Sequence, residues 1–171
     1  MSRWRLANAL VCGLAFVVAT RAAGAQASGA ARLHELVRGL TVTSRALVVG
    51  VRPEDDDGQL LAWLARGRSV ETGYLSLTRG ESAANYVGTE SGTPLGAIRT
   101  QEVLASRRID GAEQFFTRAF DFGNARNAAE TFKHWPRDTL LAEVVTVLRA
   151  FRPHVIIETV SRGFGRDEGQ Y

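Results

Sequence analysis

Hydrophobic positions change their spacing at regular intervals along the chain, and this predicts an alternation of helices and strands. Leucine and valine recur at helical spacing over residues 30–40, which predicts a helix that ends near Gly39. Residues 45–51 are almost continuously apolar, as is typical of a strand that is covered on both faces. An apolar stripe over residues 58–66 then predicts a short helix that closes at Gly67.

The second half of the chain continues this alternation. Thr93 and Pro94 are expected to cap a helix, and Asp138 is expected to be the N-cap of a later one. The further predicted elements are a strand over 70–78, a helix over 93–108 with Ile98, Leu104 and Ala105 on its inner side, a strand over 113–116, a helix that ends at Arg152-Pro153 and a strand that begins at Val155.

The order of these elements predicts an α/β fold: a three-layer, Rossmann-like parallel sheet with helices on both faces, joined by right-handed crossovers. In such sheets, sites form in the loops beyond the carboxyl ends of the strands, here residues 52–57, 79–92 and 117–137. The chain stops soon after its last predicted strand begins, so we expect the domain to be C-terminally incomplete.

The net charge of +3, from 21 basic and 18 acidic residues, belongs to the first 27 residues. They carry three arginines and no acid, which leaves 18 residues of each sign and gives no reason to expect nucleic acid as a partner. Arg3 and Arg5, the apolar run from Leu6 to Thr20 and the sequence around Ala27 predict a cleaved signal peptide over residues 1–27. We therefore expect an exported, periplasmic or extracellular protein with no stable membrane span.

After that leader, residues 28–44 form a helical lead-in and residues 45–171 the α/β domain. The only cysteine, Cys12, lies in the leader, so the exported protein is expected to contain no disulfide.

Four consecutive carboxylates, Glu54 to Asp57, follow the first predicted strand and suggest two interpretations. In the first, Asp56 or Asp57 caps the helix at 58–66 and the other carboxylates interact with the positive end of that helix. In the second, the loop is a metal or general-base site. Neither a dinucleotide fingerprint nor a phosphate-binding loop is present at this turn.

The chain resembles the LmbE-like, PIG-L deacetylases over about residues 44–168. The resemblance rests on five segments in continuous order: Leu47–Asp57, Leu75–Glu81 with Asn85, Leu95–Glu102, Phe116–Gly123 and Phe151–Ile156. It implies a zinc-dependent enzyme with a Rossmann-like sheet that removes acetyl groups from N-acetylglucosamine-type sugar conjugates. The implied alternative is a metal-free relic or carbohydrate-binding module of the same family.

The family signature is His-Pro-Asp-Asp, in which the His and the second Asp bind zinc and the first Asp is the general base. By this resemblance, Glu54 is the catalytic base and Asp55 a zinc ligand, whereas Arg52 occupies the position of the ligand His. A guanidinium has no lone pair to donate to a metal. The segment Arg166–Tyr171, which resembles the start of the third-ligand loop, contains no His either. We therefore expect Arg52 to form an internal ion pair that takes the place of the metal.

The resemblance also implies that Arg99 and Asp121 bind the sugar. Without it, Arg99 and Glu102 are equally consistent with an i,i+3 surface pair. Of the three histidines, His34 is expected on a helix surface and His154 at the opposite edge of the sheet, so that only His134 could approach the site. The neighbouring Trp135 instead favours a packed loop around His134.

Overall fold

The computed structural model describes residues 29–159 of the chain, in two compact units. In the first unit, residues 29–39 form a helix, as predicted. Leu33, Leu36 and Val37 on this helix and Leu40 in the turn after it are exposed. The predicted signal peptide and the segment Arg166–Tyr171 lie outside the described residues. Within the described residues, we find no helix long and apolar enough to cross a membrane.

The second unit is built on four parallel strands in the order β3-β2-β1-β4. These strands are β1 (Arg45–Gly50), β2 (Glu71–Ser76), β3 (Glu113–Phe116) and β4 (Val155–Glu158). Leu47 of the central strand β1 pairs with Gly73 of β2 on one side and with Ile156 of β4 on the other. Strands and helices alternate along the chain, and all four strands are parallel. Both observations confirm the predicted α/β fold.

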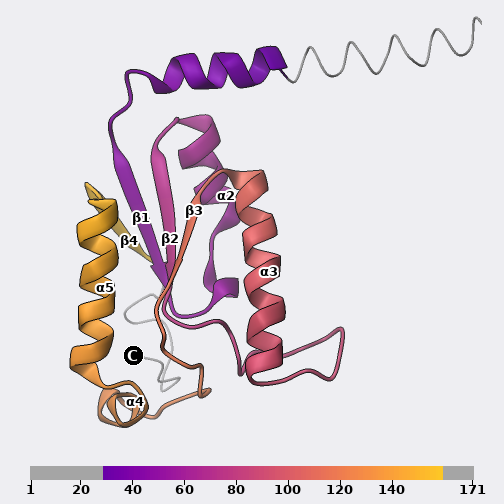
Figure 1. Ribbon diagram of the computed structural model, residues 1–171, viewed down its shortest axis with the longest axis vertical. Helices are drawn as coiled ribbons and strands as arrows, with labels where there is room; N and C mark the ends of the chain where they lie inside the picture. Colours follow the sequence, from indigo (N-terminus) through magenta and orange to yellow (C-terminus); the bar gives the residue numbers. More distant parts are fainter. Residues whose placement is uncertain (1–28, 160–171) are drawn as a thin grey trace, which may run out of the picture. The chain divides into compact units, whose positions relative to one another are not determined.

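Alternate residues of β1 face two different hydrophobic layers, which makes the domain three layers thick (Figure 1). Val48 packs with Leu61 on the side of α2 (Gly58–Ala62) and α3 (Thr93–Asp110). Leu47 packs with Phe151 on the side of α5 (Arg137–Phe151). Burial on both faces explains why β1 is a continuous apolar run.

The loops that follow β1, β2 and β3 gather at one end of the sheet (Figure 1). The first contains the 3₁₀ turn η1 (Pro53–Asp55) and leads into α2, which continues as the π-helical turn η2 (Trp63–Gly67). The third contains the short helix α4 (Ala128–His134), which the sequence pattern did not predict because its apolar positions are few. These loops hold all the residues to which the sequence assigned a function, except Arg99 on α3.

Two predicted helix starts are wrong. The N-cap of α3 is Gly92, with a φ of +65°, and Thr93 is already helical. A glycine adopts this left-handed φ without the strain that a side chain brings. The N-cap of α5 is Pro136, whose carbonyl accepts the first helical hydrogen bond from Leu140 at 3.0 Å. Asp138 lies in the first turn instead, where its charge interacts favourably with the helix N-terminus.

The predicted inner side of α3 is also wrong in part. Ile98 is 41% exposed and Ala105 is exposed, whereas Arg107 and Asp110 are buried. The helix therefore presents charged side chains to the protein interior, because Arg107 pairs there with Asp56 of the acidic loop and with Asp110. Hydrophobic spacing cannot reveal a helix face whose burial depends on ion pairs.

Candidate functional site: an ion pair at the carboxyl end of the sheet

The turn after β1 is closed by a carboxylate. One oxygen of Asp55, Oδ2, accepts hydrogen bonds from the backbone N–H groups of Val51, at 3.1 Å, and Arg52, at 2.8 Å. These bonds satisfy donors that the end of a strand leaves without partners. The predicted metal ligand therefore holds the backbone of its own loop, with Pro53 buried beneath it.

Arg52 points across the end of the sheet to the loop after β3. Its Nε lies 2.8 Å from Oδ2 of Asp121 and its Nη2 lies 3.5 Å from Oδ1, which is a two-point contact between guanidinium and carboxylate. The Asp121 side chain is 2% exposed and the Arg52 side chain 21% exposed. The internal ion pair expected for Arg52 is present, but its partner is the predicted sugar-binding residue and not a neighbour in the acidic loop.

Asp121 is held by backbone donors as well. The N–H groups of Ser82 and Gly123 donate to its two carboxylate oxygens at 3.3 and 3.0 Å. The N–H of Asp121 in turn donates to Glu81, which also accepts from the N–H of Arg79, both at 3.1 Å. The loops after β1, β2 and β3 are thus joined by two buried carboxylates and one guanidinium.

Glu81 was not identified from the sequence as a functional residue, although it belongs to one of the segments that resemble the family. It is 8% exposed and links the loops after β2 and β3. The sequence did contain an indication, because a carboxylate just after a buried strand needs hydrogen-bond or ionic partners. The identity of those partners depends on a loop 40 residues further along the chain.

Tyr74 positions the backbone on which Arg52 lies. Its side chain is fully buried, and its hydroxyl donates to the carbonyl oxygen of Arg52 at 2.6 Å. Burial, together with the charges of Asp55 and Asp56, raises the pKa of Tyr74 far above its usual value, so the phenol remains a donor. A Cβ on Gly50 would overlap the Tyr74 hydroxyl, and the absence of a side chain there allows this contact.

The last two acids of the loop have structural roles. Asp57 is the N-cap of α2, accepting from the N–H groups of Gln59 and Leu60 at 3.1 and 3.0 Å, as the first interpretation of the loop predicted. Asp56 forms an ion pair with Arg107 of α3, which also lies 3.0 Å from Asp110. This second arginine centre links the acidic loop to α3 and was not predicted from the sequence.

Glu54 lies on the turn η1, close to Arg99. The two residues line a hollow of about 130 Å³ between η1 and α3, together with Pro53, Asp56, Glu102, Val103 and Ser106. Partial burial of the carboxylate raises the pKa of Glu54, against the opposite effects of a backbone hydrogen bond and the Arg99 charge. Glu54 thus lies at the edge of a small polar hollow, beside Arg99.

Arg99 makes the predicted i,i+3 ion pair with Glu102 at 2.9 Å and donates to the carbonyl of Ala84 at 3.0 Å. Its Nε is buried and has no hydrogen-bond partner in the structure. The structure therefore brings Arg99 next to Glu54. Asp121 is in contact with Arg52 instead, on the buried side of the same loops.

The residues do not fit a zinc ion. Arg52 cannot coordinate a metal, Asp55 already accepts two backbone hydrogen bonds, and Asp121 is paired with a guanidinium. Over residues 29–159, no three His, Cys, Asp or Glu side chains form a group that could hold a metal ion.

The histidines lie elsewhere. His134 stacks on Phe122 with ring centroids 4.2 Å apart, in the packed loop that Trp135 suggested. The ring of His154 accepts from the N–H of Arg45 at 3.1 Å, at the amino end of β1, and therefore at the opposite edge of the sheet. His34 is exposed on the helix of residues 29–39.

Comparison with known proteins places the chain in a family. The sequence model described as PIG-L: GlcNAc-PI de-N-acetylase matches residues 53–166, more than half of the 171 residues. The chain belongs to the PIG-L de-N-acetylase family, as the sequence resemblance indicated, and the family is one of deacetylase-type hydrolases. A search of curated proteins finds no match.

Two solved structures are similar in fold. One is GalB, the 4-carboxy-2-hydroxymuconate hydratase from Pseudomonas putida KT2440, with 21% identity and a TM-score of 0.54 over 74% of this chain and 51% of that one. The other is a conserved protein from Thermus thermophilus, with 30% identity and a TM-score of 0.43 over 65% of this chain and 44% of that one. The chain spans about half the length of these structures.

Proposed function

We propose that this protein is a metal-independent, sugar-binding member of the de-N-acetylase family, which recognises exported conjugates of N-acetylglucosamine type. The observation that carries the proposal is the Arg52–Asp121 ion pair. By the sequence resemblance, Arg52 takes the position of the zinc-binding His in the family signature. A guanidinium neutralises the carboxylates there without coordinating a metal. In this proposal the positive charge of Arg52 takes the place of the positive charge of a zinc ion.

The polar hollow between η1 and α3 supports recognition of a sugar. Glu54 and Glu102 provide carboxylate oxygens that accept from hydroxyl groups, and Arg99 is a donor to hydroxyl or amide carbonyl oxygens. The Nε of Arg99 is buried without a partner, which costs free energy unless a ligand accepts its hydrogen bond. An acetamido sugar contains both kinds of group.

A second candidate is hydrolysis of the acetamido group, which the family match favours. In that function Glu54 is the general base, Asp55 is the metal ligand, and Arg99 and Asp121 bind the substrate. Glu54 has a raised pKa beside Arg99, which suits proton transfer. Because the described residues do not fit zinc, we derive no catalytic step for this candidate.

The two candidates are separated by three measurements on the full-length protein. Isothermal titration with N-acetylglucosamine and with glucosamine measures sugar binding, elemental analysis after dialysis measures zinc, and an acetate assay measures turnover. We expect the acetamido sugar to bind more tightly than glucosamine, with neither stoichiometric zinc nor acetate release. Stoichiometric zinc together with acetate release would establish the hydrolase instead, and no sugar binding would overturn the proposal.

A matched pair of variants on α3 tests the site itself. Arg99→Met removes the donor with the unpartnered Nε, whereas Arg108→Met removes an exposed arginine from the same helix. Loss of a hydrogen bond to a charged donor is expected to weaken binding roughly tenfold or more in Arg99→Met. Equal affinities of the two variants would show that the sugar does not bind in this hollow.

A further inference from the structure

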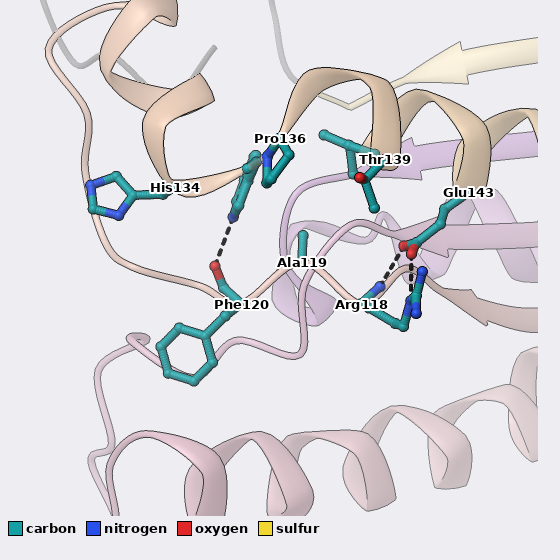
Figure 2. Close-up of a pocket in the computed structure, with 9 residues that line it drawn as sticks. Arg118, Ala119, Phe120, His134, Pro136, Thr139 and Glu143 are labelled. Atoms are coloured by element: carbon teal, nitrogen blue, oxygen red, sulfur yellow. Dashed lines mark hydrogen bonds and ion pairs between the residues drawn. The ribbon is translucent and has the colours of Figure 1, made fainter.

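The two outer strands of the sheet are covered to different extents. On β3, three of the four residues are partly buried, and Phe115 meets Phe151 of α5 edge-on, with ring centroids 5.5 Å apart. The loop that follows β3 is bound to α5 as well (Figure 2), because both carboxylate oxygens of Glu143 accept from Arg118. The backbone hydrogen bond from Arg118, with its guanidinium, holds the pKa of Glu143 below its usual value. The chain's own elements thus cover β3 on the α5 side.

The other outer strand, β4, is exposed on both faces. Val155 is 55% exposed and Ile156 is 50% exposed, although both side chains are apolar. Residues that pair across a ladder face the same side of the sheet. Ile156 pairs with Leu47 and therefore faces the α5 side, whereas Val155 pairs with Ala46 and faces the α2 side. Within residues 29–159, no strand lies beyond β4.

This edge lacks the usual protection against association. Open edge strands are commonly protected by lysine, proline or a β-bulge. Residues 155–157 carry no charge and no proline, and β4 pairs with β1 in an unbroken register. The N–H of Thr159 donates to the carbonyl of Val49 at 3.0 Å. Because alternate residues of a strand bond to the same neighbour, the peptide groups of Ile156 point to the open edge.

From these observations we infer that β4 is an interface between two copies of this chain, which pair as antiparallel strands across a two-fold axis at Ile156. A two-fold axis brings the same surface of both copies together. Each Ile156 then exchanges two backbone hydrogen bonds with Ile156 of the second copy. In this register Val155 lies opposite Ile157 of the second copy, on the α2 side. Backbone groups and apolar side chains therefore fit one register, which makes the edge complementary to itself.

The polar residues at the ends of β4 favour the same register. With the axis at Ile157 instead, each Ile156 would lie opposite the carboxylate of Glu158. With the axis at Ile156, Glu158 lies opposite His154 of the second copy. The Nδ1 atom of His154 accepts from the N–H of Arg45 at 3.1 Å, so the neutral ring carries its proton on Nε2. This Nε2–H group is a donor for a carboxylate across the axis.

Disulfide trapping on the full-length protein tests the register. In a Cys12→Ser background, which removes the only native cysteine, Ile156→Cys is expected to form a covalent dimer during air oxidation. Its two Cα atoms would lie about 5.5 Å apart, within the range of a disulfide. Val155→Cys is the matched control, because its two Cα atoms would lie about 8 Å apart and should not be linked. Electrophoresis without reducing agent measures the covalent dimer.

Sedimentation velocity over a range of concentrations tests the non-covalent dimer. Ile156→Lys places two like charges at the axis, and we expect it to weaken the dimer roughly tenfold or more. The matched control is Ile109→Lys, because Ile109 is 80% exposed on α3 and lies outside the proposed interface. Ile109→Lys should associate as the parent protein does. Association through the leader would persist in both variants.

Each result either supports the interface or overturns it. Trapping at position 156 but not at 155, together with dissociation in Ile156→Lys alone, supports it. Trapping at 155 instead of 156, or association that Ile156→Lys leaves unchanged, overturns it. A protein that is monomeric at all concentrations also overturns it, and protection of Ile156→Cys from a thiol reagent would then show that another segment of the chain covers β4. If circular dichroism shows that Ile156→Lys unfolds, the trapping result decides. The sugar-binding proposal does not depend on any of these results.

Discussion

Two arginines, Arg107 of α3 and Arg52 of the loop after β1, bind carboxylates, and their surroundings differ. Arg107 reaches two carboxylates, Asp56 and Asp110, and its side chain is 5% exposed. Arg52 reaches one, Asp121, and is 21% exposed. The Tyr74 side chain connects them, because its ring lies below the Arg107 guanidinium, 5.6 Å away, and its hydroxyl binds the Arg52 carbonyl. Arg107 is thus a buried structural link, whereas Arg52 lies at the boundary with solvent.

The comparison predicts that the loss of Arg107 has the largest effect on stability. Arg107→Met leaves two carboxylates facing the interior, and removal of one partner from a buried ion pair costs about 3–5 kcal/mol. Denaturant unfolding followed by circular dichroism measures the free energy of unfolding. The control, Arg108→Met on the same helix, should remain within about 0.5 kcal/mol of the parent. If Arg107→Met lowers the free energy of unfolding by less than Arg52→Met does, the comparison is wrong.

Arg52→Met is expected to lower the free energy of unfolding by about 2 kcal/mol. The effect is smaller because Asp121 keeps its hydrogen bonds from Ser82 and Gly123. A double-mutant cycle with Asp121→Asn should give a coupling energy of about 1–2 kcal/mol, since the two side chains are in direct contact.

The control for that cycle is Glu71→Gln, which breaks the exposed pair with Arg45 and should cost less than about 1 kcal/mol. A coupling energy near zero between positions 52 and 121 would show that Arg52 does not replace the charge of a metal.

Arg52→His tests whether the position alone determines metal binding. The variant supplies the imidazole of the family signature, but Asp55 remains bound to the backbone and no third ligand lies nearby in the described part of the chain. We expect fewer than about 0.1 zinc ions per chain after dialysis, because zinc sites need three protein ligands. One zinc per chain, measured by elemental mass spectrometry, would contradict the conclusion that the residues around position 52 do not fit a zinc ion.

Glu54→Gln should have the smallest effect, because Glu54 belongs to neither arginine centre. Its pKa is raised above 4.5, so the folded protein binds this proton more tightly than the unfolded chain does. Stability from this group therefore falls as pH rises from 4.5 through the raised pKa, and the ionised form is the unfavourable one. Near neutral pH, Glu54→Gln should be equal to the parent or more stable, by no more than about 0.5 kcal/mol.

Unfolding at several pH values measures this difference. A variant clearly less stable than the parent at pH 7 would show that the Glu54 carboxylate is held by favourable contacts. Glu143 serves as the opposite case, because its pKa is lowered and its contribution to stability is lost as pH falls through that pKa.

Local signals in the sequence predicted most of the sheet. The apolar run of β1, the third strand at Glu113–Phe116 and the helix end at Arg152 agree with the structure, because strand burial and helix termination depend on neighbouring residues. Asp57 as the cap of α2 was also predictable, since its partners are two and three residues away. The starts of α3 and α5 could not be predicted in this way, because the observed N-caps depend on the backbone conformation with which the chain enters each helix.

The sequence by itself indicated the family and the parallel sheet, and its resemblance to the family predicted that Arg52 takes the position of a zinc ligand. Only the tertiary structure decided which carboxylate that arginine binds. The partner, Asp121, is 69 residues away along the chain and follows a different strand. The same holds for Arg107 and Asp56, separated by 51 residues. The sequence shows the type and charge of each residue directly. The pairing of buried charges depends instead on which segments the fold brings together around the parallel sheet.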